Sequence, residues 1–409
     1  MEFMTGVYLF FIITSLYLTF LVLILHYKNK GNLREIREPT VFPNISVLIP
    51  AWNEGETIGD TIQAVLDSDY PEDKLEVIVV NDKSSDNTLE EMKKFGDKVR
   101  VVDNEKNLGK SGSLNKIAKM AKGDILAVVD ADSYPNKESM RQMVAYFEEE
   151  GVGAVTSAIL VKDGKTRLEK LQAVEYTIIA WNRKLLQFIE GIYVTPGPLS
   201  MYRKEAMLLD GGFDTKNITE DIEMTWKILK HGYKVRIDLN SKVYCSSPNT
   251  LKMWWKQRLR WNLGGMQTMI KYRRLIFNPK YGMMGLFVVP FFITTFFLSL
   301  VGLGVFFYVL LKKIFQSYLM TKYAYISSSS FLTADTLNLN ANVFALFATI
   351  LIIFGLLYLI YSQKYVIDRK IGIKDIPLFA LYLLIYLSLY PFVLVHSIWR
   401  FLVTKKFEW

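Results

Sequence analysis

The chain has 409 residues, of which 51% are hydrophobic and 22% are charged, and its formal net charge is +9. This composition is too apolar for one soluble domain and too charged for a pure bundle of membrane helices, so we expect a mixed architecture. The positive charge fits the cytoplasmic flanks of membrane spans, and without a basic stripe among aromatics we expect no nucleic-acid partner. The single cysteine, Cys245, excludes an intrachain disulfide, and three scattered histidines exclude a zinc-type cluster.

The first predicted element is a membrane span over residues 5 to about 25, an apolar run long enough to cross a bilayer. Lys28, Lys30 and Arg34 follow this run, and no Lys or Arg precedes it. A secretory signal peptide has the opposite order, so we expect a signal anchor with the following domain in the cytosol. The predicted divisions of the chain are an N-terminal span (1–27), a cytosolic α/β domain (28–250), interface helices (251–280) and a C-terminal membrane region of about three spans (281–409).

Between residues 44 and 240, short runs rich in β-branched residues alternate with helical stretches. The predicted strands are 45–49, 76–80, 99–102 and 125–129, and the predicted helices between them are 57–68, 85–95 and 112–121. This alternation predicts a doubly wound α/β sheet whose ligands lie at the carboxyl ends of the parallel strands.

Two longer helical stretches, residues 167–188 and 251–275, combine apolar and basic side chains. The pattern predicts amphipathic helices at the membrane interface, and ordinary core helices are the alternative. After Pro279 the chain becomes membrane-like, and the predicted spans are 284–311, 343–361 and 376–403.

The linkers between these spans bear on the orientation of the chain. Residues 327–342 are polar and nearly free of Lys and Arg, which indicates an external linker, whereas the basic linker 364–374 indicates a cytoplasmic one. A count of four spans places the carboxyl end outside, but Arg400 and the lysines after it favour the inside. Pro391 is a candidate break that would divide the last segment into a re-entrant or short-helix pair.

Polar groups follow the first two predicted strands. The loop after the first strand has groups that are candidates to line a base or ribose pocket, namely Pro50, Ala51, Asn53 and Glu54. Asp82 follows the second strand, where a carboxylate can accept hydrogen bonds from a uracil N–H or a ribose hydroxyl. For the nearby Asp86, a helix cap is an equally good explanation.

Asp130 and Asp132 follow the fourth predicted strand and are the metal signal in this sequence. Residues two apart at a strand end point the same way, so both carboxylates can face one cation that bridges a diphosphate. Oxygen ligands suit a hard divalent ion, Mg²⁺ or Mn²⁺. Lys110 precedes a predicted helix and is a candidate to neutralise a phosphate, with a solvated surface charge as the alternative.

Thr219-Glu220-Asp221 opens a predicted helix, with Thr219 as a plausible cap. Asp221 is the candidate general base that removes the proton from an acceptor hydroxyl, and Glu220 or Glu223 are alternatives. The plainer interpretation is a capped helix with an acidic first turn.

Gln257, Arg260 and Trp261 lie at positions i, i+3 and i+4 of a predicted helix and therefore share a face. A Trp ring gives a sugar a stacking surface, while Arg and Gln offer donors to a diphosphate leaving group. We group Arg258 with them as candidates for the diphosphate and acceptor. A basic helix that binds anionic lipid explains Lys256 and Arg258, but not the Gln and Trp.

Together these residues resemble the processive, membrane-integrated family 2 glycosyltransferases, which include hyaluronan, chitin, cellulose and poly-N-acetylglucosamine synthases. The resemblance covers residues 43–261 and the flanking spans. It implies a GT-A fold, which is a Rossmann-like doubly wound sheet, and inverting transfer from a UDP-sugar. No regulatory domain of the kind found in cellulose synthases follows the spans in this sequence.

The resemblance also implies roles for the residues above. Asp82 would contact uridine, and Asp130 and Asp132 would hold the metal and the diphosphate. Asp221, as the last residue of its motif, would be the base. The Gln-x-x-Arg-Trp face would bind the pyrophosphate beside the acceptor end.

Residues 194–203 look like the Gly-Pro segment of hyaluronan and chitin-oligosaccharide synthases, where the acceptor enters. Gly197 and Pro198 match that segment, whereas Pro196 departs from it and puts the acceptor fit in doubt. The segment favours UDP-N-acetylglucosamine as the donor.

The expected partners are a UDP-sugar, a growing glycan and the lipid bilayer, in a multi-pass protein of the plasma membrane that couples synthesis to export. Transfer of one sugar to a polyprenyl phosphate or ceramide-like lipid remains an alternative, as does a non-catalytic membrane scaffold. The sequence leaves the linkage and the oligomeric state open.

Overall fold

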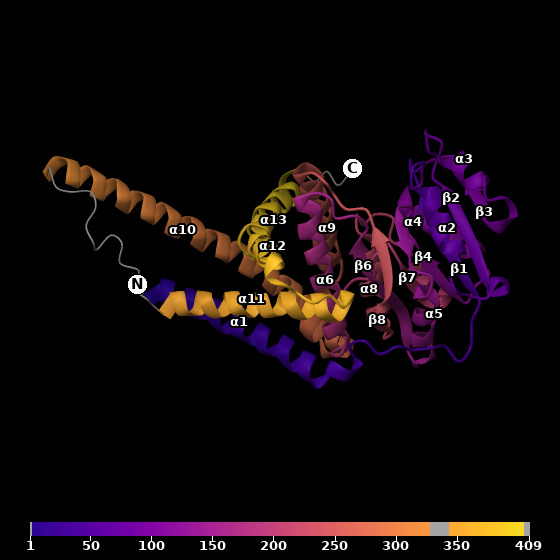
Figure 1. Cartoon of the computed structure of the whole chain (residues 1–409), viewed down its shortest axis with the longest axis horizontal. Helices are drawn as coiled ribbons and strands as arrows, with labels where there is room; N and C mark the ends of the chain where they lie inside the picture. Colours follow the sequence, from indigo (N-terminus) through magenta and orange to yellow (C-terminus); the bar gives the residue numbers. More distant parts are fainter. Residues whose placement is uncertain (1, 328–342, 405–409) are drawn as a thin grey trace.

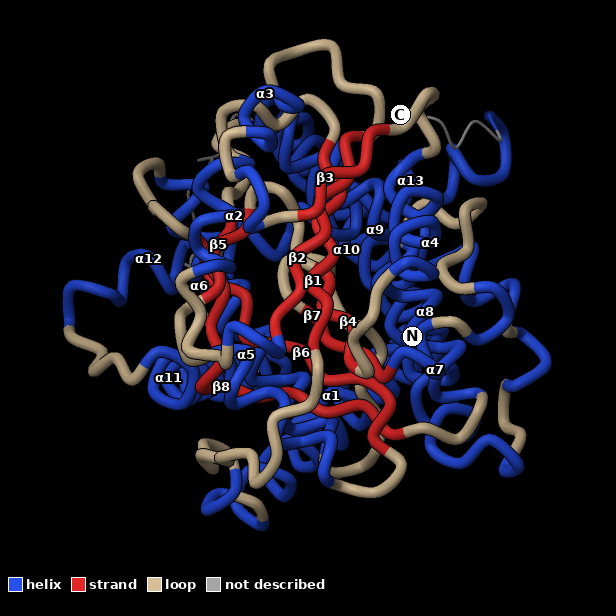
Figure 2. The backbone as a smooth tube through the Cα atoms, turned by 90° about the vertical axis from the view of Figure 1, so that its right-hand side faces the viewer, coloured by secondary structure: helices blue, strands red, loops and turns tan. Residues whose placement is uncertain are grey.

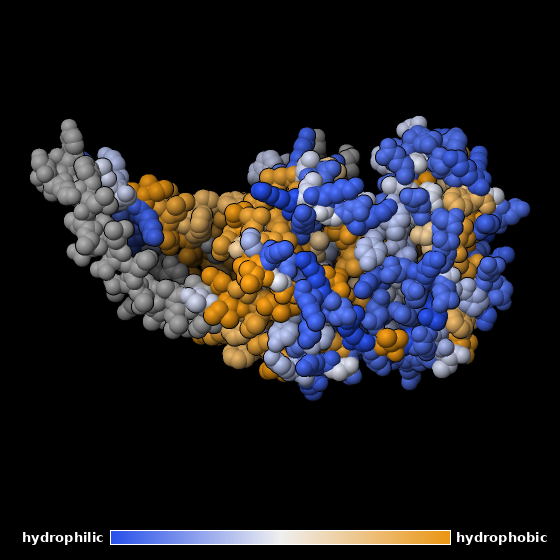
Figure 3. Space-filling view, in the orientation of Figure 1, coloured by the Kyte–Doolittle hydropathy of each residue, from blue (hydrophilic) through white to orange (hydrophobic). Residues whose placement is uncertain are grey.

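The structure, a computed structural model, describes residues 2–327 and 343–404. An α/β domain lies at one end of the molecule and a group of long helices at the other (Figure 1). The surface of the α/β domain is mainly hydrophilic, whereas hydrophobic side chains cover the adjoining helices (Figure 3). The two parts correspond to the mixed architecture that the composition predicts.

The α/β domain is built on one eight-stranded mixed sheet (Figure 2). Its strands are β1 (Ile45–Ala51), β2 (Leu75–Asn81), β3 (Arg100–Asp103), β4 (Ile125–Val128), β5 (Ser133–Pro135), β6 (Val152–Val161), β7 (Ser200–Arg203) and β8 (Lys234–Cys245). They are arranged in the order β3-β2-β1-β4-β7-β6-β8-β5. Strands β1 to β4 are parallel, β7 runs antiparallel to both β4 and β6, and β8 is parallel to β6.

Helices cover both faces of this sheet, as predicted for a doubly wound domain. The shorter ones are α2 (Ile58–Leu66), α3 (Thr88–Lys93), α4 (Gly109–Met120), α5 (Ser139–Val144), α7 (Lys204–Met207) and α8 (Glu220–Lys230). Val47 of β1 packs in one core with residues of α2 and α5, while its neighbour Leu48 packs in the opposite core with α4 and α8. Because every residue of β1 is buried, its sequence is apolar at every position except Ser46.

Helices α6 (Arg167–Gln187) and α9 (Leu251–Lys271) lie between the sheet and the membrane helices. Thr166 begins α6 with a capping box to Glu169. The helix packs on β6 and β8 on one side and on a membrane helix on the other, so Arg183 and Lys184 are both only 2% exposed. The basic side chains expected around an interface helix are therefore partly enclosed in the fold.

The remaining helices are α1 (Glu2–Lys28), α10 (Val289–Ser327), α11 (Val343–Ile367), α12 (Ile376–Leu381) and α13 (Tyr390–Trp399). Among the described residues, three helical segments are long and apolar enough to cross a membrane, namely Leu9–Lys28, Met284–Tyr323 and Ile373–Thr404, and Ile352–Ile367 is a shorter apolar helix. Helix α1 lies along α11 (Figure 1), where the hydroxyls of Tyr27 and Tyr361 are 3.1 Å apart. Most of the linker predicted to be external, residues 328–342, lies outside the described residues.

Helices α12 and α13 are joined by continuous helical turns, so Pro391 does not interrupt the last segment. Pro391 lies in the first turn of α13, where its missing N–H removes no helical hydrogen bond. A π-helical turn at Tyr382–Tyr386 and a 3-10 turn at Leu387–Leu389 precede it. The segment Ile373–Thr404 is therefore one irregular helical stretch that is long and apolar enough to cross a membrane.

Candidate active site

Asp82 lies at the carboxyl end of β2, as predicted, and is 3% exposed. Its Oδ1 accepts hydrogen bonds from the side-chain amide of Asn104 at 2.9 Å and from the backbone N–H of Leu108 at 2.8 Å. Asn104 in turn donates to the hydroxyl of Ser113 and accepts from Lys116. This network holds the carboxylate in one orientation before any ligand arrives.

The loop after β1 is tied to the loop after β2. Asn53 has a left-handed backbone, with φ of 55°, and its side-chain oxygen accepts a hydrogen bond from the Ser85 N–H at 2.8 Å. The Glu54 N–H donates to the hydroxyl of Thr88 at 2.8 Å. The Asp86 carboxylate accepts a hydrogen bond from the Thr88 N–H at 3.0 Å, but the N-cap residue of α3 is Asn87, so Asp86 lies one position before the helix cap considered for it.

Lys110, in the first turn of α4, connects the end of β4 to the start of α8. Its Nζ lies 2.6 Å from Asp130 Oδ1 and 3.0 Å from Glu220 Oε1. Burial lowers the pKa of Lys110, but the charges of Asp130 and Glu220 outweigh this effect and raise it. Lys110 is therefore a fixed cation of the site and not a solvated surface charge.

The carboxylates after β4 fit a hard divalent cation that is held jointly with a substrate. Burial, and then the charges of Asp130 and Glu54, raise the pKa of Asp132 to about 6, so negative charge is crowded here. Within the described part of the chain, no group of three or more His, Cys, Asp or Glu side chains is placed to hold a metal ion alone. Mg²⁺ commonly uses one or two carboxylates together with substrate phosphates, and Asp130 and Asp132 suit such a site.

The backbone at Gly197 lies directly against this acidic edge. A Cβ at this position would be 2.5 Å from Lys110 Nζ and 2.6 Å from Asp130 Oδ2, so any larger residue would displace one of these two side chains from its present position. The segment is fixed by the buried Thr195, whose N–H donates to the hydroxyl of Thr225 at 2.8 Å. The predicted Gly-Pro segment is thus held rigidly beside the predicted metal site.

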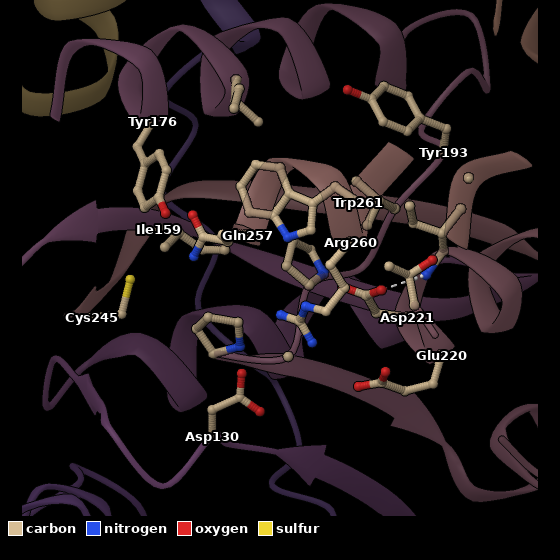
Figure 4. A pocket seen from close by; sticks show the side chains of 18 of the residues that line it. Asp130, Ile159, Tyr176, Tyr193, Glu220, Asp221, Cys245, Gln257, Arg260 and Trp261 are labelled. Atoms are coloured by element: carbon tan, nitrogen blue, oxygen red, sulfur yellow. Dashed lines mark hydrogen bonds between the residues drawn. The ribbon is translucent and has the colours of Figure 1, made fainter. Parts of the chain in front are cut away.

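Glu220 and Asp221 are the first residues of α8, and their surroundings shift their pKa values in opposite directions. Burial raises the pKa of Glu220, but the charge of Lys110 outweighs it and lowers the pKa. Burial, and then the charge of Glu220, raise the pKa of Asp221 to about 6. Asp221 Oδ1 accepts a hydrogen bond from the Ile222 N–H at 2.8 Å (Figure 4). Asp221 is therefore the better proton acceptor of the two.

Two alternatives for the start of α8 are not supported. Thr219 makes no side-chain capping hydrogen bond. Glu223 is completely buried, and its carboxylate binds Lys271 at 2.6 Å and the hydroxyl of Tyr272 at 2.8 Å. Glu223 also forms an ion pair with Lys227 at 3.4 Å, so it is bound inside the fold and is not available as a base.

Gln257, Arg260 and Trp261 of α9 line the same cavity, in agreement with their helical spacing. Arg258 lies outside the cavity lining and is 1% exposed, which differs from its predicted position beside the diphosphate. Its guanidinium forms an ion pair with Glu175 of α6 and lies 4.0 Å from the centre of the Trp261 ring. Arg258 therefore packs against the Trp261 ring from outside the cavity lining.

The side chains from these elements surround one cavity of about 410 Å³. In Figure 4, Asp130 and Glu220 lie on one side of Arg260 and Trp261, and Tyr176 and Tyr193 lie on the other. The predicted residues that line the cavity are Lys110, Asp130, Asp132, Gly197, Pro198, Glu220, Asp221, Gln257, Arg260 and Trp261. The predicted residues outside its lining, which lie at or after the ends of β1 and β2, are Pro50, Ala51, Asn53, Glu54 and Asp82.

Several residues that line the cavity were not predicted from the sequence. They include Tyr176 and Arg183 of α6, Tyr193, and Phe292 and Phe296 of α10. Burial lowers the pKa of Arg183 to about 10. The sequence shows the charge of Arg183 but not the fold that encloses it. Nothing in the sequence distinguishes the two phenylalanines from those that face lipid.

Comparisons with known proteins agree with this geometry. Residues 46–208 match the family model described as Glycosyl transferase family 2. The chain is 35% identical over 232 residues to a poly-beta-1,6-N-acetyl-D-glucosamine synthase of Staphylococcus epidermidis and 34% identical to one of Staphylococcus aureus strain COL, in each case over 56% of both chains. It therefore spans only a little over half the length of these relatives.

A solved structure extends the comparison beyond the matched domain. A mannosyltransferase from Pyrobaculum calidifontis, solved in complex with GDP-Man and Mn²⁺, aligns with a TM-score of 0.53 over 88% of this chain and 99% of its own. Its sequence identity to this chain is 21%, so the match shows a shared fold. The predicted GT-A fold class is confirmed.

Proposed function

We propose, from the match of residues 46–208 to the Glycosyl transferase family 2 model, that the chain transfers N-acetylglucosamine from a UDP-sugar to the growing end of a polysaccharide. The observation that carries the proposal is the meeting of three groups around one cavity: the acidic edge after β4, the Asp221 carboxylate and the Gln257-Arg260-Trp261 face. Similarity to poly-beta-1,6-N-acetyl-D-glucosamine synthases supports the choice of sugar and of a polymeric acceptor.

The donor would occupy the carboxyl ends of the parallel strands. Asp82 would contact uridine, beside the loop that carries Asn53 and Glu54, and the diphosphate would lie toward Asp130 and Asp132. These two carboxylates would hold Mg²⁺ or Mn²⁺, and the Mn²⁺ in the solved mannosyltransferase supports a divalent ion. When bound, such a cation neutralises charge on the diphosphate.

The acceptor would attack the donor sugar from the Trp261 side. Asp221 takes the proton of the acceptor hydroxyl while that oxygen bonds to the anomeric carbon and the bond from this carbon to the UDP oxygen breaks. This displacement inverts the anomeric carbon. Lys110 and Arg260 stabilise the negative charge that develops on the departing UDP, and the Trp261 ring provides the surface on which the acceptor sugar stacks.

Export would follow from the position of the cavity. Phe292 and Phe296 lie on α10, within the candidate span Met284–Tyr323, so a membrane helix forms part of the cavity wall. A polar glycan cannot cross hydrocarbon unaided, and a protein-lined path that begins at the transfer site would let each added sugar push the chain outward. We place the transferase domain in the cytosol and the protein in the plasma membrane.

Transfer of one sugar to a membrane lipid is the second candidate, since the same aromatic wall suits a lipid tail. The first test is UDP release by the purified, detergent-solubilised protein with Mg²⁺ or Mn²⁺ across a panel of UDP-sugars, with the products sized on a gel. We expect release with UDP-N-acetylglucosamine and a ladder of long products. A single lipid-linked sugar would establish the second candidate, and no release with any donor would contradict both.

A further inference from the structure

Arg183 is a buried cation that the proposed chemistry does not yet use. Its side chain lines the cavity, and neither Nε nor Nη1 has a hydrogen-bond partner among the described residues. Lys184, the next residue and equally buried, donates instead to the backbone oxygen of Ile237 at 3.0 Å. A buried guanidinium without such partners destabilises a fold, so its retention in a cavity wall points to a ligand.

Arg183 and Tyr193 both line the cavity and are close enough for their charges to interact. The Tyr193 ring packs edge-on against Phe292 of α10 at 4.7 Å. In Figure 4, Tyr193 lies on the opposite side of Trp261 from Asp130. A donor whose diphosphate binds at Asp130 therefore leaves the space at Arg183 for the acceptor.

The chemistry of the site limits what this acceptor is. The site offers Asp221 as a base, and a base is needed when the attacking group is a hydroxyl that must lose a proton. A phosphate acceptor arrives already ionised and needs no such base. Sugar hydroxyls and amide carbonyls also supply the acceptor oxygens that unpaired guanidinium N–H groups require.

We propose that Arg183 binds the acceptor glycan, with its guanidinium donating hydrogen bonds to oxygen atoms of the sugar at the growing end. Tyr193 and Phe292 form the apolar wall against the same sugar, on the membrane side of Trp261. This inference rests on the proposed function and names a residue that selects its acceptor.

The test is Arg183→Met, which removes the charge and keeps an apolar side chain of similar length. Hydrogen bonds from charged donors are strong, so we expect the KM for a β-1,6-linked N-acetylglucosamine oligomer to rise about 10-fold to 100-fold. UDP affinity should be unchanged. The melting temperature should stay equal or rise, because an unpaired buried charge is removed. Arg183→Lys should recover part of the acceptor affinity.

The matched control is Lys184→Met, which removes a cation that is equally buried on the same helix but outside this cavity lining. We expect this variant to lose some thermal stability, because Ile237 loses its hydrogen bond, and to keep the wild-type KM for the oligomer. An unchanged KM in Arg183→Met would overturn the inference, and so would a lowered melting temperature, which would make Arg183 a structural residue.

Failure of the inference and failure of the proposed function give different results. If the wild-type protein extends no oligomer but glycosylates polyprenyl phosphate, the proposed function fails on the wild type alone, and the inference fails with it. If the wild type extends the oligomer and Arg183→Met does so equally well, only the role of Arg183 is lost.

Discussion

Asp221 and Glu220 are adjacent carboxylates to which the fold gives opposite properties. Lys110 binds Glu220 and keeps it ionised, whereas burial and the neighbouring charge make Asp221 easier to protonate. A residue that accepts a proton near neutral pH and lies beside the acceptor surface has the properties of a general base. The ion-paired Glu220 instead fixes the position of Lys110.

Replacing the proposed base separates chemistry from binding. We expect Asp221→Asn to reduce UDP release by about 10²-fold to 10⁴-fold, the usual contribution of a general base, while UDP binding persists. Its melting temperature at pH 8 should not fall, because a carboxylate with a raised pKa destabilises the fold when ionised. Glu223→Gln is the contrasting variant, since losing the ion pairs to Lys271 and Lys227 should lower the melting temperature. Wild-type turnover in Asp221→Asn would remove this residue from the mechanism.

The raised pKa of Asp221 also predicts a pH dependence. The base works only when unprotonated, so kcat/KM should be constant above the pKa and fall as the pH drops through about 6. A pH profile of UDP release at saturating metal measures this. The residual activity of Asp221→Asn should lack the inflection, and an identical profile in both proteins would assign the inflection to another group.

Helices α8 and α9 approach each other so closely that the base and the Gln-x-x-Arg-Trp face form one site. A Cβ at Gly264 of α9 would lie 2.0 Å from the hydroxyl oxygen of Thr219, directly before α8. At Gly265 a Cβ would meet nothing within 4 Å. The contact between α8 and α9 therefore depends on Gly264 and not on Gly265.

The glycine pair gives a matched test of this contact. We expect Gly264→Ala to lower stability by about 1–3 kcal/mol through overpacking and to reduce transfer, because α9 must shift away from Asp221. Gly265→Ala should raise stability by up to about 1 kcal/mol, as alanine favours helix over glycine. Thermal unfolding of both variants in detergent measures the difference, and equal melting temperatures would show that the two helices are not closely packed.

How well each element could be predicted from the sequence depends on how it is packed in the fold. The apolar runs that predicted β1 and β4 are strands whose residues are all buried, and most of β2 is buried too, so these sequences carry a clear signal, whereas β3 is an exposed edge strand. Strands β5 and β7 have only three and four residues and pair with neighbours distant in sequence, so no local pattern marks them. Arg183 was expected on a membrane surface, because amphipathicity does not show that a second layer of helices covers the other face.

Across the whole molecule, a buried polar cluster joins helices α6 and α9 to the last apolar helical segment. Arg258 of α9 forms an ion pair with Glu175 of α6 and donates to the hydroxyl of Tyr390 of α13 at 2.9 Å. The hydroxyl of Tyr386 donates to Glu175 at 2.6 Å and accepts from the Trp254 ring N–H at 2.6 Å. The surroundings of Arg258 thus tie the helix that carries Trp261 to the membrane region.

Breaking one partner of this cluster should weaken the whole protein. We expect Glu175→Gln to cost about 3–5 kcal/mol, because Arg258 is left as a buried charge without its counter-ion. Transfer should fall as well, since Arg258 supports the Trp261 ring. The double variant Glu175→Leu/Arg258→Met removes both charges and should recover much of the melting temperature. A single variant as stable as the wild type would show that the ion pair contributes little.

Because α10 forms part of the cavity wall, the α/β domain alone does not enclose the proposed active site. A soluble fragment that ended before α10 would lack Phe292 and Phe296, and bulk water would enter beside Trp261. Water is itself a hydroxyl acceptor, and Asp221 would deprotonate it as readily as a sugar. Helix α10 therefore keeps bulk water out of the cavity. A fragment without it should become a sugar-nucleotide hydrolase that releases UDP without building polymer.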